Sequence, residues 1–122
     1  MNKTEKLELI RSTGVVAIMR AQSSDQLIAA ADAIRLGGVL AIEVTMTTPG
    51  ALGVIGQATQ RYGDDVLFGA GSVLDAETAR AAILAGAGFV VAPTLSVDVV
   101  KLCNRYSIPV MPGIFPRAEK IP

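Results

Sequence analysis

The sequence predicts an α/β fold in which parallel strands alternate with helices. Short apolar runs at 15–19, 41–44, 66–69, 89–92 and 109–111 are separated by stretches with helical periodicity. This alternation is typical of parallel strands joined by crossover helices. The composition agrees, because 51% of the residues are hydrophobic and only 18% are charged, as expected for a sheet covered by helices. We expect a single domain over residues 1–122.

The first two helices are predicted from periodicity and from the glycines that follow them. The first is expected over 4–12, before Gly14, and the second over 24–36. Gly37 and Gly38 are expected to end the second helix, because glycine adopts the left-handed backbone found after many helices.

Capping residues predict the starts of the later helices. Thr48 is expected as the N-cap of the third helix, with Pro49 in its first turn, where a missing N–H costs nothing. Asp75 and Ser96 have the same capping chemistry and predict the starts of the fourth and fifth helices.

Two architectures fit five strand–helix units: an open doubly wound sheet, or part of an eight-stranded (β/α)8 barrel. A dinucleotide site of the open-sheet kind needs three glycines in a G-x-G-x-x-G run after the first strand. Gly69 and Gly71 instead follow the third strand, and Leu74 occupies the third position. A response regulator needs clustered acids after the first strand, which here ends in Met19 and Arg20. The sequence therefore favours an incomplete TIM (β/α)8 barrel with about five strands and four to five helices.

Charge and residue usage exclude several functions. The chain has 11 basic and 11 acidic residues, so its neutral balance indicates neither nucleic acid nor an anionic membrane as a partner. It contains no histidine, and Cys103 is its one cysteine, which argues against Ser-His or Cys-His catalysis and against most zinc sites. Cys103 has helical spacing from Val99 and Tyr106 and is expected in the core. We expect a cytoplasmic protein without a metal or another cofactor.

Glu43 is the strongest candidate for chemistry. It interrupts an apolar strand that is predicted to be buried on both faces, where a carboxylate is costly without a partner. Burial raises the pKa of a carboxyl group toward the range that a general base needs near neutral pH. The alternative is structural: Glu43 closes a salt bridge with Arg20, which ends the first strand. Arg20 itself could bind a substrate carboxylate or phosphate, pair with Glu43, or point into solvent.

Small polar residues surround these two in the predicted site. Thr45, Thr47 and Thr48 follow Glu43 and could donate hydrogen bonds to a substrate, although a helix cap is the simpler role for Thr48. The run 69–72, Gly-Ala-Gly-Ser, follows the third strand and allows close approach to the backbone.

Five runs at strand ends resemble the family of 2-keto-3-deoxy-6-phosphogluconate (KDPG) and 4-hydroxy-2-oxoglutarate (KHG) aldolases, in its N-terminal part. They are Val-Ala-Ile-Met-Arg at 16–20, Ile-Glu-Val-Thr-Met-Thr at 42–47, Gly-Ala-Gly-Ser-Val-Leu at 69–74, Val-Ala-Pro at 91–93 and Met-Pro-Gly at 111–113. The resemblance covers about residues 9–113, and the order of the five runs makes it specific.

The resemblance implies a trimeric barrel and a class I aldolase without a metal. In that family a lysine forms a Schiff base with the keto carbon of the substrate, and a glutamate moves protons as the molecule splits into pyruvate and an aldehyde. Glu43 matches that glutamate. Arg20 and Thr47 match positions near the carboxylate of the pyruvyl group, and some members carry arginine where Thr47 stands. Ser72 and Pro93 match residues that line the site.

The chain departs from the family at the nucleophile. The Schiff-base lysine of the family lies on a sixth strand, in a Lys-x-Phe-Pro-like run beyond residue 122. Of the lysines present, Lys3, Lys6 and Lys101 are expected on helices and Lys120 in a tail, so none is expected to face the site. We therefore expect little or no aldolase turnover from this chain alone. The alternatives are a non-catalytic half-barrel that self-associates and binds small anions weakly or not at all, and a shortened reading of a longer gene.

Overall fold

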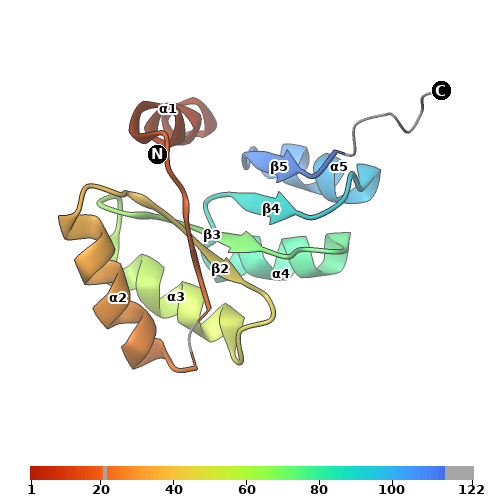
Figure 1. The fold of residues 1–122 in the computed structure, drawn as a ribbon. Helices are drawn as coiled ribbons and strands as arrows, with labels where there is room; N and C mark the ends of the chain where they lie inside the picture. Colours follow the sequence, from red (N-terminus) through yellow and green to blue (C-terminus); the bar gives the residue numbers. More distant parts are fainter. Residues whose placement is uncertain (21, 115–122) are drawn as a thin grey trace.

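The structure is a computed structural model that describes residues 1–20 and 22–114. Helices and strands alternate along the chain, as the sequence predicts (Figure 1). The five helices of the described part are α1 (Lys3–Thr13), α2 (Ser24–Leu36), α3 (Ala51–Tyr62), α4 (Ala76–Ala85) and α5 (Val97–Arg105). The strands are β1 (Ala17–Met19), β2 (Ala41–Thr45), β3 (Leu67–Gly71), β4 (Val90–Ala92) and β5 (Val110–Pro112).

All five strands lie parallel, in the order β1-β2-β3-β4-β5, so each strand pairs with its neighbour in the sequence. In the register of the sheet, Ile18 lies beside Glu43 and Glu43 lies beside Gly69. Thr45 lies beside Gly71, and Val91 lies beside Met111. Sequential order without a reversal point is the arrangement of a βα-barrel wall, not of a doubly wound sheet. The prediction of an incomplete barrel is confirmed.

The main hydrophobic core lies between the sheet and helices α2–α5. Side chains at alternate positions of the strands, such as Ile42, Val44 and Phe68, point to this side. Leu27 of α2 and Ile55 of α3 pack against them and have no solvent exposure. Because a Leu or Ile side chain contributes about 1.5–3 kcal/mol on full burial, this layer holds the sheet and helices together.

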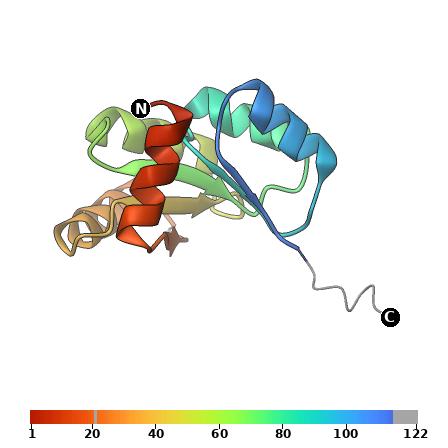
Figure 2. The ribbon, with the colours of Figure 1, turned by 90° about the horizontal axis from the view of Figure 1, so that it is seen from above.

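A second, smaller cluster lies on the other face of the sheet, which we call the inner face. It contains Ala41, Leu67 and Phe89, all buried, and Leu9 and Ile10 of α1 pack against it. Figure 2 shows α1 on one side of the strands and α4 and α5 on the other side. Helix α1 therefore covers the part of the inner face that lies near the amino ends of the strands and leaves the carboxyl ends uncovered.

Polar caps explain most of the helix ends. Asp75 and Ser96 accept hydrogen bonds from the backbone N–H groups of Thr78 and Val99, as predicted. The prediction for Thr48 is wrong: α3 begins at Ala51, and its N-cap is Gly50 in a left-handed conformation with φ 65°. The Thr48 side chain instead turns inward and is buried, within hydrogen-bonding distance of Thr45.

Only one of the two glycines after α2 has the predicted left-handed backbone. Gly37 keeps a right-handed backbone with φ −78°, so its expected left-handed conformation is wrong. Gly38 adopts φ +98° and releases the chain toward β2. A backbone with this φ is strained for any residue with a side chain, which explains a glycine at 38.

Cys103 is buried in the core next to Val99, as predicted, and burial raises the pKa of its thiol. Within the described ranges, no group of three or more His, Cys, Asp or Glu side chains is placed to hold a metal ion. In the same ranges, each helix is too short or too polar to cross a bilayer.

Candidate active site

The predicted site residues lie in or just after four neighbouring strands. Glu43 is inside β2, and Arg20, Ser72 and Pro93 directly follow β1, β3 and β4. Thr47 lies two residues beyond β2. Because the strands are parallel, their carboxyl ends meet at one edge of the sheet, where barrel enzymes place their active sites. The topology therefore brings all five positions to one end of the molecule.

Glu43 lies on the inner face and is almost completely buried, with 6% of its surface exposed. It shares this face with Ala41, two residues earlier in the strand. Burial raises the pKa of its carboxyl group, and the positive charge of Arg20 opposes that rise only in part. The prediction of a buried acid with a raised pKa thus agrees with the structure.

The structural alternative for Glu43 is a salt bridge with Arg20. Among the residues that the structure describes, no ion pair or hydrogen bond reaches the Glu43 carboxyl group. Arg20 is exposed at the end of β1 and acts on Glu43 only through its electric field. Glu43 is thus a buried acid held without a paired charge, a state that costs stability.

Two glycines of β3 make room on the inner face. A side chain at Gly69 would collide with the Phe89 ring, at about 2.5 Å from its nearest atoms. A side chain at Gly71 would overlap the carboxyl group of Glu43. The close approach expected of the run 69–72 is therefore made by protein side chains. The sequence pattern did not reveal the contact between Gly71 and Glu43, because it depends on the register between β2 and β3.

Three threonine hydroxyl groups gather at the end of β2. The Thr45 Oγ1 lies 2.9 Å from the Thr47 Oγ1 and 3.4 Å from the Thr48 Oγ1. Thr45 and Thr48 are buried, whereas Thr47 is exposed. A hydroxyl group both donates and accepts hydrogen bonds, so Thr45 can orient Thr47 toward a ligand above the sheet edge.

Ser72 and Pro93 complete the edge. Ser72 has φ +57°, a left-handed backbone that is uncommon outside glycine, and its side chain is half-buried. Such strain at a strand end is frequent at binding sites. Pro93 is exposed after β4, and its carbonyl group lies against Gly113, whose N–H donates to Ala92 at 2.8 Å. The roles of Ser72 and Pro93 in binding stay predictions.

The lysines of the described part lie away from this edge. Lys101 is exposed on α5, and Lys3 and Lys6 belong to α1. Lys120, the tail lysine considered as a nucleophile, lies outside the described residues. The three described lysines thus all belong to helices, as the sequence predicts.

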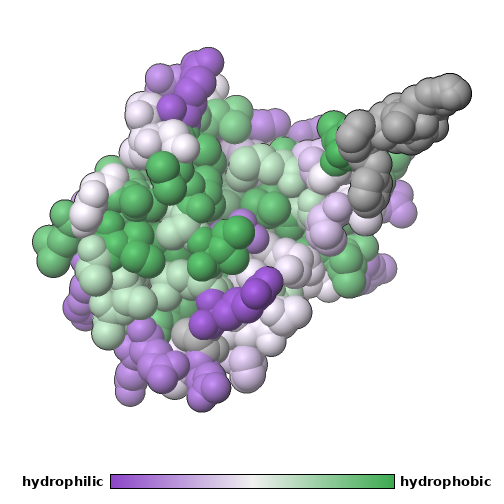
Figure 3. Space-filling model, in the orientation of Figure 1, coloured by the Kyte–Doolittle hydropathy of each residue, from purple (hydrophilic) through white to green (hydrophobic). Residues whose placement is uncertain are grey.

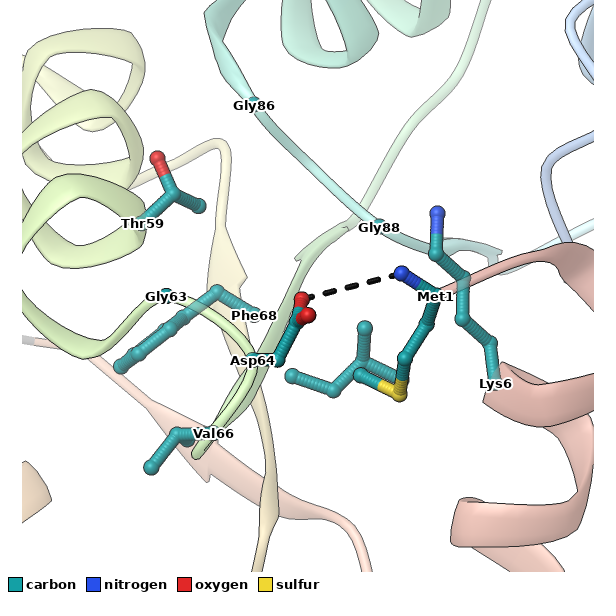
Figure 4. A pocket seen from close by; sticks show the side chains of 10 residues that line it. Met1, Lys6, Thr59, Gly63, Asp64, Val66, Phe68, Gly86 and Gly88 are labelled. Carbon is teal, nitrogen blue, oxygen red and sulfur yellow. Dashed lines mark ion pairs between the residues drawn. The ribbon is translucent and has the colours of Figure 1, made fainter.

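Lys6 lines a pocket of about 270 Å³ between α1 and the start of β3 (Figure 4). Burial lowers the pKa of the Lys6 amine, and Asp64 partly offsets this effect. The Met1 amine lies 3.7 Å from the Asp64 carboxylate in the same pocket. Because Val66 and Leu67 form the pocket wall at the amino end of β3, it is separate from the edge that carries Glu43.

A parallel βα sheet in sequential strand order, with a buried acid among the residues near its carboxyl edge, is the arrangement of a (β/α) barrel wall. A family model described as KDPG and KHG aldolase matches residues 7–121, and the chain belongs to this family.

Known members of the family are similar over almost the whole chain. It is 39% identical over 115 residues to a 2-dehydro-3-deoxy-phosphogluconate aldolase of Treponema pallidum, covering 94% of this chain and 53% of that protein. It is 30% identical over 112 residues to the KHG/KDPG aldolase of Escherichia coli K12, covering 92% and 52%. The chain thus spans about half the length of the curated relatives it matches.

Solved structures have the same arrangement. A 4-hydroxy-2-oxoglutarate/2-dehydro-3-deoxyphosphogluconate aldolase superposes with a TM-score of 0.81 at 28% identity, over 98% of this chain and 56% of that one. The KDPG aldolase of Zymomonas mobilis, solved with 3-phosphoglycerate, gives a TM-score of 0.80 at 28% identity, over 93% and 54%.

Proposed function

We propose that this chain supplies the acid–base part of a class I, Schiff-base aldolase. The reaction is the cleavage of a 2-keto-3-deoxy sugar acid, its phosphate, or 4-hydroxy-2-oxoglutarate, to pyruvate and an aldehyde. The observation that carries the proposal is Glu43, buried at the carboxyl edge of the sheet without a paired charge. Family membership supports the reaction class.

Cleavage of a 4-hydroxy-2-keto acid needs one group that first accepts and then returns a proton. The base takes the proton of the hydroxyl group as the neighbouring carbon–carbon bond breaks, and the released aldehyde carries the new carbonyl group. The electron pair of that bond passes to the pyruvyl fragment, which is bound as an enamine and takes a proton back. A carboxyl group with a raised pKa suits both steps, since the higher pKa makes it a stronger base and the same group can then return the proton.

Other residues of the edge are proposed to bind the substrate. Arg20 supplies the positive charge for the pyruvyl carboxylate, and Thr47 donates a hydrogen bond from a hydroxyl group oriented by Thr45. Ser72 and Pro93 line the same edge. The covalent step needs a lysine, which we propose is supplied by a sixth strand, as the resemblance implies, and not by residues 1–122.

A chimera tests this proposal. Residues 1–113 of this chain are joined to the remaining half of the Escherichia coli KHG/KDPG aldolase, and pyruvate release is measured with KHG and KDPG. We expect turnover from the chimera, and a loss of about 10²–10⁴-fold in kcat for its Glu43→Gln variant. A matched Glu77→Gln variant, on the exposed start of α4, should keep the activity.

The outcomes separate the two halves of the proposal. Residues 1–122 alone, incubated with pyruvate and borohydride, should gain no covalent adduct in intact-mass analysis, whereas the chimera should gain one. An adduct on residues 1–122 would show that this chain carries its own nucleophile. A chimera whose kcat is unchanged by Glu43→Gln would refute the role of Glu43.

The exposed inner face favours a second candidate, self-association of the chain. Ile18 lies beside Glu43 in the register and is 63% exposed. Figure 3 shows apolar residues gathered between α1 and α2, where β1 runs. Edge strands such as β1 also carry unpaired backbone groups that can pair with another chain. One similar structure, 29% identical to this chain, is a designed cage made by fusing symmetric oligomeric domains, which is consistent with association in the family.

Sedimentation velocity of residues 1–122 tests self-association. We expect a species larger than the monomer, and a shift to monomer in Ile18→Asn because it removes apolar surface from the inner face. Leu36→Asn is the control, since Leu36 is 87% exposed at the end of α2, a helix that packs on the other side of the sheet. A monomeric parent chain would contradict self-association.

A further inference from the structure

Gly71 and Glu43 occupy one space on the inner face. Gly71 is the last residue of β3 and is buried beside Thr45 of β2. A Cβ atom placed on Gly71 would overlap the Oε1, Cδ and Cγ atoms of Glu43. The end of the Glu43 side chain therefore lies directly on the backbone of β3, in the volume that any other residue at 71 would fill.

The neighbouring glycine of β3 shows that this arrangement is specific. Gly69 faces the same side of the sheet, two residues earlier, and its missing side chain makes room for the Phe89 ring. The strand thus has two side-chain-free positions on one face, one filled by an apolar ring and the other by a carboxyl group. Packing alone explains Gly69, whereas Gly71 leaves its space to the proposed catalytic group.

If a side chain at 71 filled this space, the Glu43 carboxyl group could move in only one direction. Below it the inner face is filled by Ala41, Leu67 and Phe89. On the side of β1, Ile18 is exposed, and Arg20 is the charged group whose field acts on Glu43. A displaced carboxyl group would move toward solvent and Arg20, where its charged form is better stabilised.

We propose that Gly71 is a positioning residue for Glu43: the absence of a side chain at 71 holds the carboxyl group in a buried position against β3. The contact itself stands on the geometry, whereas its meaning for catalysis rests on the proposed function of Glu43. Proton transfer requires a carboxyl group within hydrogen-bonding reach of the substrate, so a displacement of one methyl group's width is enough to weaken it.

A titration of Glu43 tests the position directly. The Glu43 side-chain carboxyl carbon is followed by ¹³C NMR between pH 3 and 9 in residues 1–122, in Gly71→Ala and in the matched Gly69→Ala. We expect the pKa of Glu43 to fall in Gly71→Ala toward the ordinary glutamate value, because the carboxyl group becomes hydrated and approaches Arg20. Gly69→Ala strains Phe89 and should leave this pKa close to that of the parent chain.

A double-mutant cycle keeps the test decisive if Gly71→Ala unfolds. Glu43→Ala removes the Cγ, Cδ and Oε1 atoms that a methyl group at 71 would meet. The urea midpoint lost through Gly71→Ala should therefore be mostly regained when Glu43→Ala is present, whereas the loss through Gly69→Ala should not. Additive losses in the Gly71 cycle, or an equal fall in the Glu43 pKa for both glycine variants, would overturn the proposal.

The result is separable from the proposed function. A Glu43 pKa that responds to Gly71→Ala in a chain whose chimera has no aldolase activity would support the positioning contact and refute the aldolase role. An active chimera whose kcat falls with Glu43→Gln but not with Gly71→Ala would support the role of Glu43 and refute the positioning role of Gly71.

Discussion

Replacement of Glu43 by glutamine should stabilise the protein above neutral pH. Glutamine has nearly the same shape as glutamate but carries no charge, so the substitution removes the cost of a buried carboxylate. Glu43 has 6% exposure and no ion pair among the described residues. A buried polar group left without its partners costs about 1–3 kcal/mol and a charged one costs more, so glutamine at 43 keeps only the smaller of the two costs. We expect Glu43→Gln to raise the free energy of unfolding by about 1–3 kcal/mol at pH 8.

The pH dependence fixes the sign of this effect. The pKa of Glu43 is raised in the folded protein, so folding takes up a proton at pH values between the ordinary value of 4.5 and the raised value. The contribution of Glu43 to the stability of the parent chain is therefore greatest below pH 4.5, falls as the pH rises across this window, and levels off above it. Glu43→Gln should lack this fall, so the two chains should differ little at pH 4 and most at pH 8.

Thermal unfolding followed by circular dichroism measures the difference. For a domain of this size 1 kcal/mol corresponds to about 4 °C in Tm, so we expect Glu43→Gln to melt about 4–12 °C above the parent at pH 8. The control Glu77→Gln, at an exposed position, should change the Tm by less than about 2 °C at either pH. A Glu43→Gln variant that melts at or below the parent temperature at pH 8 would refute the account of Glu43 as a buried, unpaired acid.

Three further changes test the site and the fold. Arg20→Gln should raise the pKa of Glu43 further, since Arg20 lowers it, and the ¹³C titration of Glu43 measures this; an unchanged pKa would mean that the two groups do not interact. Leu27→Ala should lower the free energy of unfolding by about 2–5 kcal/mol in urea, because Leu27 has no exposure, and a loss below about 1 kcal/mol would contradict its place in the core. Asp75→Ala should cost about 1 kcal/mol in the same assay, because Asp75 accepts the Thr78 N–H at 2.7 Å, whereas Asp75→Asn keeps an acceptor and should cost less.

The helices were predictable where local chemistry alone decides them. Helix α2 runs over Ser24–Leu36, as periodicity and the following glycines indicate. The start of α3 was not predictable in the same way. Thr48 and Pro49 suit a helix start, but they equally suit a turn, and the Thr48 hydroxyl group lies within hydrogen-bonding distance of the Thr45 hydroxyl group just after β2. A contact between side chains decided what the local pattern left open.

The candidate site likewise has one feature that the sequence of a single strand predicts and others that depend on contacts between strands. The burial of Glu43 follows from an acid within an unbroken apolar strand, which the sequence displays directly. The absence of an ion pair with Arg20 depends on how far apart two strand ends lie, and the contact with Gly71 depends on the register of β2 against β3. Such relations between strands are set by the packing of whole elements, so one strand's sequence does not contain them.

The sequential order of the strands has a consequence for synthesis of the protein. Each strand pairs with the one made just before it, so a new unit can join the growing edge as soon as it leaves the ribosome. Each pairing thus closes over one strand–helix unit and not over the whole chain, which limits the sequence separation of the strand contacts. Each unit added in this way extends the same sheet edge, so the wall repeats one local pairing along its described length.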